Sequence, residues 1–329
     1  MWYITFHGGK HSNNIRAYDN SGNLLKKRVL KKKSSTGKLR LKELRAIGVG
    51  PDGYLWVVNA YRKRSEILRF EGTPRKDGRH RYVDHYASER TVKGIVHPFA
   101  FAFDEHGRCF ISSQDTNVVT GIAAKDTPMP IAPFLRELQG SHFLEGTFVA
   151  SSRGRLPRSP MVTTDVDAPQ GLGVAFETSR SGKVKVHHSV RDILFYEQFL
   201  YVADEAADAV KVYDQTGTLI HSITDDELKA PVHLLREGDN IYIGSTKDKK
   251  ILCYTVKTMK LSHVVSGINE ISGIAIGCDG RLYIASRTNS VADPSSSGTI
   301  WRCNVDGSAL RVFIATLPDS PEFILPMPH

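Results

Sequence analysis

Short hairpins of alternating hydrophobic residues recur along the whole chain. In the stretch 273–285, GIAIGCDGRLYIA, Ile274 and Ile276 alternate with smaller residues, a turn follows at 278–280, and Leu282 begins a second apolar run. A period of two is typical of a half-buried strand, and glycine in the turn accepts a positive φ. Comparable hairpins lie at 46–58, 100–112, 191–203 and 232–244. This self-similarity indicates a repeat architecture.

An aromatic residue marks the second strand of each hairpin: Tyr3, Trp56, Phe110, Tyr201, Tyr242 and Tyr283. The interval of 91 residues between Phe110 and Tyr201 is too long for one unit, and Thr147–Ser151, TFVAS, supplies another second strand around Phe148. Further short strands follow each hairpin, and four antiparallel strands in roughly 40–50 residues are typical of propeller blades. We predict an all-β, seven-bladed β-propeller of four-stranded antiparallel blades. The alternative is six blades, with 121–190 as one expanded blade.

The two ends of the chain complement each other. Met1 leads directly into a second strand, whereas the tail 321–325, PEFIL, has the pattern of a first strand. Pairing between them would complete the N-terminal blade and remove an open sheet edge. We therefore expect the C-terminal strand to close the N-terminal blade, with residues 1–329 forming a single β-propeller domain.

The segment 50–70, GPDGYLWVVNAYRKRSEILRF, is a hairpin followed by a strand that begins near Ile67. It resembles the repeat of virginiamycin B lyase-like propellers, and the other units are similar to NHL repeats. The resemblance covers nearly the whole chain and implies the β-propeller architecture. It does not define an activity, because this fold includes enzymes, carriers and scaffolds.

Virginiamycin B lyases use a histidine at the start of a first strand, a glutamate at the end of the second strand of the same blade, and a divalent metal ion. The equivalent pairs here are Arg45 with Asn59, Phe99 with Ser113, Val190 with Asp204, Pro231 with Ser245, and Ser272 with Ser286. None is a His–Glu pair, which argues against that particular lactone-opening elimination.

Charged residues gather where the starts of first strands and the ends of second strands should face one end of the blades. Glu322 aligns with the small residues Ala46, Ala100 and Gly273, and His233 aligns with apolar residues. Charge at such positions is costly unless it is paired or coordinating, so its convergence indicates a site. A salt-bridge network that only fixes the fold is the competing interpretation. We predict an active site in a central funnel at this top face.

Side-chain chemistry suggests the roles. His233, Glu322 and Asp192 are the candidate catalytic residues, with His233 as the base. Asp204 and Glu322 are candidate ligands of a divalent metal ion, Mg²⁺ or Ca²⁺; no organic cofactor is expected. The candidate ligand-binding residues are Arg45, Arg191, His7, Gln114, Arg153 and Arg287.

Two functions of different classes fit these residues. The mixed charges favour an enzyme that acts on a small polar or anionic molecule by acid–base or metal-assisted lyase or hydrolase chemistry. The absence of a known catalytic motif favours the alternative, a non-catalytic propeller that binds a ligand or a protein.

The net charge of +9 is concentrated in the lysine-rich segment 26–42. This segment fits either a patch for phosphate or an acidic membrane or a solvated edge strand protected by lysine. Aromatic residues do not alternate with its lysines, which argues against nucleic acid. No apolar run approaches the roughly 18 residues of a membrane span, and Met1 begins no signal peptide. We expect a cytoplasmic monomer.

Overall fold

The computed structural model describes residues 1–31, 33–34, 37–61, 64–92, 95–114, 118–122, 174–178, 184–188, 190–215, 217–288 and 297–327. The regular secondary structure of these residues consists of β-strands and one short 3-10 helix, η2 (Val256–Thr258). The chain divides into two compact units, unit 1 (Met1–Ser88 and His233–His329) and unit 2 (Glu89–Val232). One domain over residues 1–329 stays a prediction.

Unit 1 contains four antiparallel sheets of four strands, and the third of them begins two residues before the unit boundary. The first is β27 (Ser320–Pro326), β1 (Trp2–His7), β2 (Arg16–Tyr18) and β3 (Leu24–Lys26). The second is β6 (Leu44–Val49), β7 (Leu55–Asn59), β8 (Glu66–Phe70) and β9 (Tyr82–Ser88). The third is β19 (Pro231–Glu237), β20 (Asn240–Ser245), β21 (Lys250–Thr255) and β22 (Lys260–Ser266). The fourth is β23 (Ile271–Ile276), β24 (Leu282–Ser286), β25 (Thr299–Cys303) and β26 (Arg311–Ile314).

Unit 2 contains one sheet of three described strands and one of four. The three-stranded sheet is β10 (Pro98–Phe103), β11 (Cys109–Ser113) and β12 (Val118–Ile122). The four-stranded sheet is β15 (Val190–Tyr196), β16 (Phe199–Asp204), β17 (Ala209–Tyr213) and β18 (Leu219–Thr224). Two separate hairpins complete the described strands: β4 (Lys33–Ser34) with β5 (Gly37–Lys38), and β13 (Val174–Thr178) with β14 (Val184–His188).

The fold is an all-β propeller, and the described residues provide six blades rather than seven. The seven-bladed prediction is wrong because β10 and β11 lie directly against β15, which leaves no place for a blade between β12 and β15. Strands β13 and β14 lie in the interval that was assigned to the extra blade, and among the described strands they pair only with each other. The strand expected at Thr147–Ser151 lies outside the described residues. The six-bladed alternative is correct.

The predicted hairpins form. Ile274 pairs with Ile284 across β23 and β24, and Gly280 in the turn has a φ of 69°. The six aromatic residues that mark the repeat each lie on the second strand of a blade, and all are buried. In unit 1, Tyr283 on β24 also joins its blade to another, since its ring centroid lies 4.1 Å from that of Trp2 on β1. Burial of these large rings supplies much of the core between blades.

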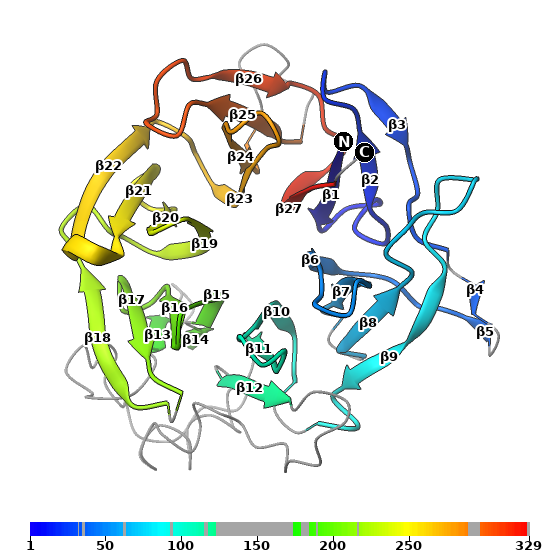
Figure 1. Cartoon of the computed structure of the whole chain (residues 1–329), viewed down its shortest axis with the longest axis horizontal. Coiled ribbons are helices and arrows are strands. Elements are labelled where there is room, and N and C mark those ends of the chain that lie inside the picture. The colour runs from blue at the N-terminus through cyan, green and yellow to red at the C-terminus, as the bar shows by residue number, and fades with distance from the viewer. Residues whose placement is uncertain are drawn as a thin grey trace. The chain divides into compact units, whose positions relative to one another are not determined.

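The C-terminal strand closes the N-terminal blade, as predicted. Trp2 pairs with Pro326 and Ile4 with Ile324, and the N–H of Phe323 donates to Thr5 Oγ1 at 3.0 Å. Figure 1 shows β27 in red beside β1 in blue, with both chain ends nearby. β27 also lies against β23 and β6, the first strands of two other blades of unit 1. Two ends of the sequence thus build one blade.

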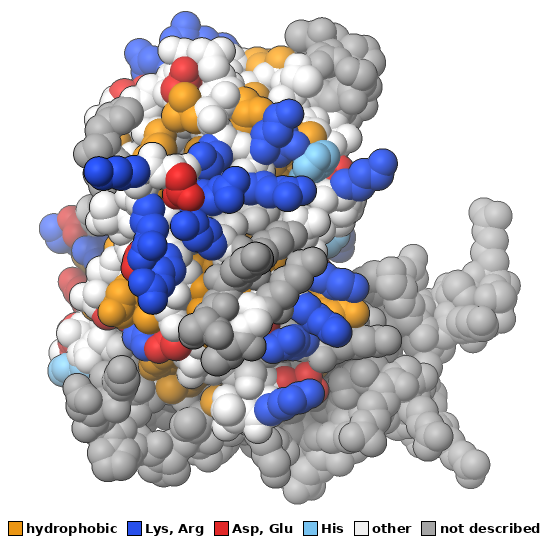
Figure 2. All heavy atoms as spheres, turned by 90° about the vertical axis from the view of Figure 1, so that its right-hand side faces the viewer, with side chains coloured by type: hydrophobic (Ala, Val, Ile, Leu, Met, Phe, Trp, Pro, Cys, Tyr) orange, Lys and Arg blue, Asp and Glu red, His pale blue; other side chains and the backbone are white. Residues whose placement is uncertain are grey.

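Part of the lysine-rich segment follows the outer strand β3. Lys31 pairs with Asp77 at 3.3 Å, and the Lys42 ammonium lies 4.4 Å from the centre of the Tyr61 ring. The face that carries β3, β8 and β9 shows many Lys and Arg side chains, with some Asp and Glu among them (Figure 2). Among the described residues, no helix is long and apolar enough to cross a membrane.

Replacing the buried Ile324 by alanine tests the closing strand. Ile324→Ala removes apolar volume from the core between blades, where Ile324 is 7% exposed, and should lower the unfolding free energy by about 2–5 kcal/mol in urea titrations. Ile220→Ala makes the same change on β18 at a side chain that is 55% exposed, and should stay within about 0.5 kcal/mol of wild type. Equal effects of the two substitutions would contradict the closure.

Candidate functional site

Three first strands of unit 1, β6, β23 and β27, carry bulges near their starts, and two predicted site residues lie in them. In β6, Leu44 pairs with Asn59 and Ile47 with Val57, so two residues oppose one. Arg45 is the first residue of this bulge. A bulge bends the strand and redirects its side chains, and it is a recurrent feature beside active sites.

The bulge in β27 is equivalent. Pro321 pairs with Phe6 and Ile324 with Ile4, which leaves Glu322 and Phe323 opposite Thr5. Glu322 therefore has the same place in its blade as Arg45 has in the next, and its expected alignment with Ala46 is wrong by one position, since Phe323 stands there. The backbone fits closely against β23, because a Cβ on Gly273 would lie 2.7 Å from the Glu322 carbonyl oxygen.

Glu322 lies at the centre of a group of charged side chains in unit 1, which we call the charge cluster: Glu322, Arg45, Arg287, His7 and Glu43. Arg287 Nη2 donates to Glu322 Oε2 at 2.5 Å, and Arg45 Nη1 lies 3.7 Å from Oε1. His7 Nδ1 lies 3.5 Å from Oε2. The Glu322 side chain is 0% exposed, whereas those of Arg287 and His7 are 28% and 41% exposed. The carboxylate is thus the buried floor of a cluster that opens to solvent through His7 and Arg287.

Glu43 completes the cluster and was missed by the sequence analysis. Arg45 Nη2 donates to Glu43 Oε1 at 3.1 Å, so Arg45 lies between two carboxylates. The spacing of two residues between Glu43 and Arg45 was the available signal, because alternate residues of an extended strand share a face. The two arginines and two glutamates balance in charge when His7 is neutral.

The protonation states follow from burial and neighbouring charge. Burial raises the pKa of Glu322, but the charges of Arg287, Arg45, His7 and His233 outweigh it and lower that pKa to about 2. Glu322 is therefore ionised at neutral pH and is a poor proton donor or acceptor there. Burial also lowers the pKa of His7 below 6.5. The charge of Glu322 raises this pKa, but the charges of Arg287 and Arg45 lower it further. His7 is therefore a neutral imidazole at neutral pH.

His233, the predicted base, has a different setting. It is 1% exposed, and its ring meets that of Phe323 edge to face with centroids 4.7 Å apart. Its charge contributes to the lowered pKa of Glu322, which places it near the cluster. A side chain so enclosed offers a substrate no approach, so the structure favours a packing and electrostatic role for His233.

Asp204 and Asp192 lie in unit 2. Asp204 is fully buried, with Lys211 Nζ 3.0 Å from its Oδ2 and the Ala207 N–H donating to its Oδ1 at 3.3 Å. Asp192 Oδ1 accepts the N–H of Ile193 at 2.9 Å. Both carboxylates thus have contacts with their own blade.

The other predicted ligand-binding residues are also in unit 2. Arg191 forms an ion pair with Glu205, and the Gln114 N–H donates to the His97 carbonyl at 3.1 Å. Arg153 lies outside the described residues. The structure therefore brings together four predicted residues of unit 1: His7, Arg45, Arg287 and Glu322. The others that it describes belong to unit 2: Arg191, Asp192, Asp204 and Gln114.

The residues expected to bind a divalent metal do not fit that role. Among the described residues, no group of three or more His, Cys, Asp or Glu side chains is arranged to hold a metal ion. Glu322 lies between two guanidinium groups, and Asp204 lies against an ammonium group. Cations of the chain thus occupy the oxygens that Mg²⁺ or Ca²⁺ would use.

The glycine-rich loop after β1 binds an anion of its own chain. The His11 N–H and Nδ1 lie 2.6 and 2.8 Å from Asp319 Oδ2. Gly9 has a φ of 65°, and a Cβ there would lie 2.2 Å from the Asp319 carboxylate. This loop therefore anchors the start of β27 and positions Glu322 three residues further along the chain.

Comparisons with known proteins show a similarity of fold. No protein-family model and no curated protein matches the sequence. A nidogen/laminin complex is similar in structure, with a TM-score of 0.56, 11% identity and coverage of 98% of this chain and 96% of that chain. Catalytically inactive virginiamycin B lyase from Staphylococcus aureus with quinupristin has a TM-score of 0.50, 11% identity and coverage of 96% and 85%. These similarities confirm the expected resemblance to NHL-type and virginiamycin B lyase-like propellers as one of fold alone.

Neutralising Glu322 tests the electrostatics of the cluster. Glu322→Gln leaves the buried Arg45 and the partly exposed Arg287 beside an uncharged group and should lower the unfolding free energy at pH 6 by roughly 3–5 kcal/mol. Because the folded pKa of about 2 lies below the ordinary value of 4.5, the stabilisation by ionised Glu322 is present above pH 4.5. It should be lost as the pH falls toward 2, by about 3 kcal/mol in total.

Urea unfolding at pH 6 and pH 3 measures this effect. The difference between wild type and Glu322→Gln should be smaller at pH 3, whereas Glu89→Gln at an exposed position should show little difference at either pH. A difference that is unchanged between the two pH values would contradict the lowered pKa of Glu322.

Proposed function

We propose that the protein is an enzyme that binds a small anionic molecule at the charge cluster and removes a proton from it with His7. The observation that carries this proposal is the contact of 3.5 Å between His7 Nδ1 and the buried, ionised carboxylate of Glu322. A carboxylate beside Nδ1 favours the tautomer with its proton on that atom, which leaves Nε2 as the basic nitrogen. His7 is neutral at neutral pH and 41% exposed, so it can receive a proton from a bound molecule.

The two arginines of the charge cluster supply positive charge that complements an anionic ligand. Arg287 is 28% exposed and holds Glu322 through Nη2, so part of its guanidinium group can contact a ligand at the surface of the cluster. Arg45 adds a buried positive charge behind it. Guanidinium groups fixed in this way favour a carboxylate or a similar anion. They also stabilise negative charge that develops on a substrate as its proton leaves.

The reaction class that this arrangement supports best is a lyase reaction. His7 Nε2 takes a proton from carbon, the electron pair of that bond forms a double bond, and a leaving group departs with its own bonding electrons. The fixed carboxylate of Glu322 orients His7 and stabilises the imidazolium that forms. Hydrolysis, in which His7 takes the proton from a water molecule, is the related alternative.

A binding protein without catalysis is a second candidate. Arg45 is 4% exposed and pairs with both Glu43 and Glu322, as it would in a network that only shapes a binding surface. The cytoplasmic location, the monomeric state and the exclusion of nucleic acid also stay predictions.

A panel of small carboxylates and lactones tests the function on the full chain. Molecules that raise the melting temperature are followed by NMR for turnover. His7→Gln should bind a substrate within about threefold of wild type but turn it over at least ~100-fold more slowly. Wild-type turnover should fall as the pH decreases through the pKa of His7, which lies below 6.5, because protonated imidazole is no base. His263→Gln, at an exposed position on β22, is the matched control and should behave as wild type.

Different results separate the candidates. Turnover by His7→Gln at the wild-type rate would overturn the role of His7. Binding that weakens in Arg287→Ala, with no turnover by wild type, would support the binding protein instead. Binding that Arg287→Ala leaves unchanged would remove the charge cluster as the site.

A further inference from the structure

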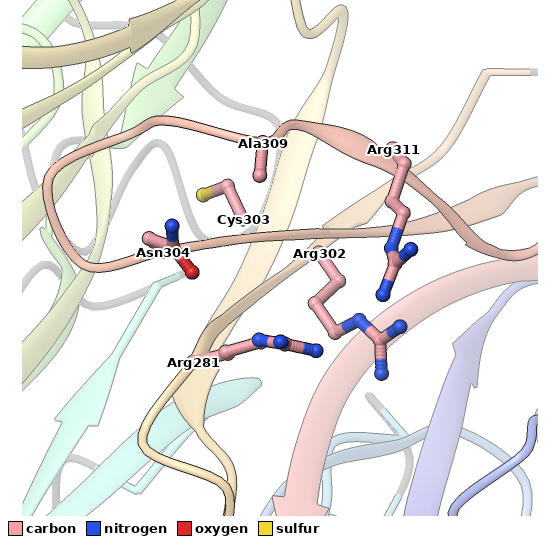
Figure 3. A pocket seen from close by; sticks show the side chains of 6 residues that line it. All are labelled: Arg281, Arg302, Cys303, Asn304, Ala309 and Arg311. Atoms are coloured by element: carbon pink, nitrogen blue, oxygen red, sulfur yellow. The ribbon is translucent and has the colours of Figure 1, made fainter.

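The fourth blade of unit 1 has a cavity of its own that the proposed function does not use. It has a volume of about 140 Å³ and lies at the outer strands β25 and β26, where it is lined by Arg281, Arg302, Cys303, Asn304, Ala309 and Arg311. Figure 3 shows the guanidinium groups of Arg281, Arg302 and Arg311 turned toward one another.

The three arginines carry more positive charge than their surroundings neutralise. Arg281 and Arg302 share one carboxylate, since their Nη1 atoms lie 3.8 and 3.9 Å from Asp279 Oδ2. Arg311 has no side-chain hydrogen bond or ion pair with any of the residues that the structure describes. Arg302 and Arg311 also stand directly opposite each other in the β25–β26 ladder, an arrangement that is unfavourable for like charges. With Asp279 and the nearby Asp306 set against the three arginines, the cavity keeps a net positive charge, and a bound anion would relieve the opposition of Arg302 and Arg311.

Neighbouring groups hold Arg302 in place. Its guanidinium carbon lies 5.4 Å from the ring centre of Phe313 and 5.8 Å from that of Tyr283, and Nη1 donates to the Tyr283 hydroxyl at 3.3 Å. Its buried Nε has no hydrogen-bond partner among the described residues. A guanidinium fixed on aromatic rings keeps its planar set of donors available at little cost in conformational entropy.

The opposite wall is neutral and shaped by a turn. Burial, together with the charge of Asp306, raises the pKa of the Cys303 thiol to about 11, so the thiol stays uncharged. The Asn304 N–H donates to the Ser308 carbonyl at 2.9 Å, and Ala309 follows in the left-handed region with a φ of 57°. The residues that line this wall are thus uncharged, although the carboxylate of Asp306 lies close enough to affect Cys303.

We propose that this cavity binds the phosphate group of a small molecule, either inorganic phosphate or a phosphomonoester. Guanidinium groups match the geometry of phosphate oxygens through paired N–H donors. The local excess of positive charge matches the dianion that a phosphomonoester forms near neutral pH. The site shares none of its lining residues with the charge cluster, so the two proposals stand independently.

Isothermal titration calorimetry of the full chain with inorganic phosphate and with glycerol 2-phosphate, at constant low ionic strength, tests this site. Wild type should show saturable binding. Arg311→Ala and Arg281→Ala should each weaken it by about tenfold or more, the usual effect of losing a hydrogen bond to a charged group. Arg302→Lys should weaken it comparably, because the positive charge remains while the paired donors are lost. Arg81→Ala, which removes the same charge from a side chain that is 59% exposed and outside the cavity, should bind as wild type.

Each outcome decides the proposal. Tighter binding of glycerol 2-phosphate than of phosphate would identify a phosphomonoester site, and equal or weaker binding a site for phosphate itself. The absence of saturable binding by wild type would overturn the proposal. An equal loss of affinity in Arg81→Ala and Arg311→Ala would also overturn it, because binding would then depend on the net charge of the protein and not on this cavity.

Discussion

The antiparallel pairing of β27 with β1 is the constraint on which both the fold and the charge cluster depend. It completes one blade from the two ends of the chain, with Ile4 opposite Ile324. The same register pairs His7 at the end of β1 with Ser320 at the start of β27, so that His7 meets Glu322. The contact that favours His7 as a base therefore exists only because the blade is closed, and stability and the proposed chemistry share one set of backbone hydrogen bonds.

Bulges explain how a regular repeat accommodates charged residues at positions that pack elsewhere. Arg45 and Glu322 occupy equivalent bulges in adjacent blades of unit 1, and the bend in each strand directs their side chains into the cluster. In β23 the corresponding residues are small, which allows β27 to approach. Ser272 Oγ donates to the Pro321 carbonyl at 2.7 Å, and Gly273 leaves space for the Glu322 backbone. The repeat thus varies in side-chain size where the site requires it.

The sequence contained the correct number of blades in its six aromatic positions, from Tyr3 to Tyr283. The error arose from assuming a uniform repeat length, which turned the long interval after Phe110 into an extra blade. A hairpin such as β13–β14 cannot be distinguished from half of a blade by its alternation, because the pattern does not show which strands it pairs with. The convergence of Arg45, Arg287 and Glu322 could be predicted from their positions in the repeat. The bulges and the burial of His233 could not be predicted, because they depend on packing between strands that the sequence pattern of one strand does not show.

The proposed function would account for a charge cluster that stability alone does not require. Burying ions costs several kcal/mol each, and well-packed apolar residues of similar volume are often as stabilising as a buried ion pair. In the cluster, two arginines surround a carboxylate that is fully buried, whereas the equivalent residue of β23 is the small, uncharged Ser272. An arrangement that only fixed the fold would gain nothing from the partial exposure of His7 and Arg287 at its surface. The same reasoning applies to the cavity at β25 and β26, where Arg311 faces Arg302 across the ladder with no compensating partner among the described residues. In the cavity the chain keeps positive charge that an anionic ligand would stabilise, and in the charge cluster it keeps balanced ion pairs where packing alone would favour apolar residues.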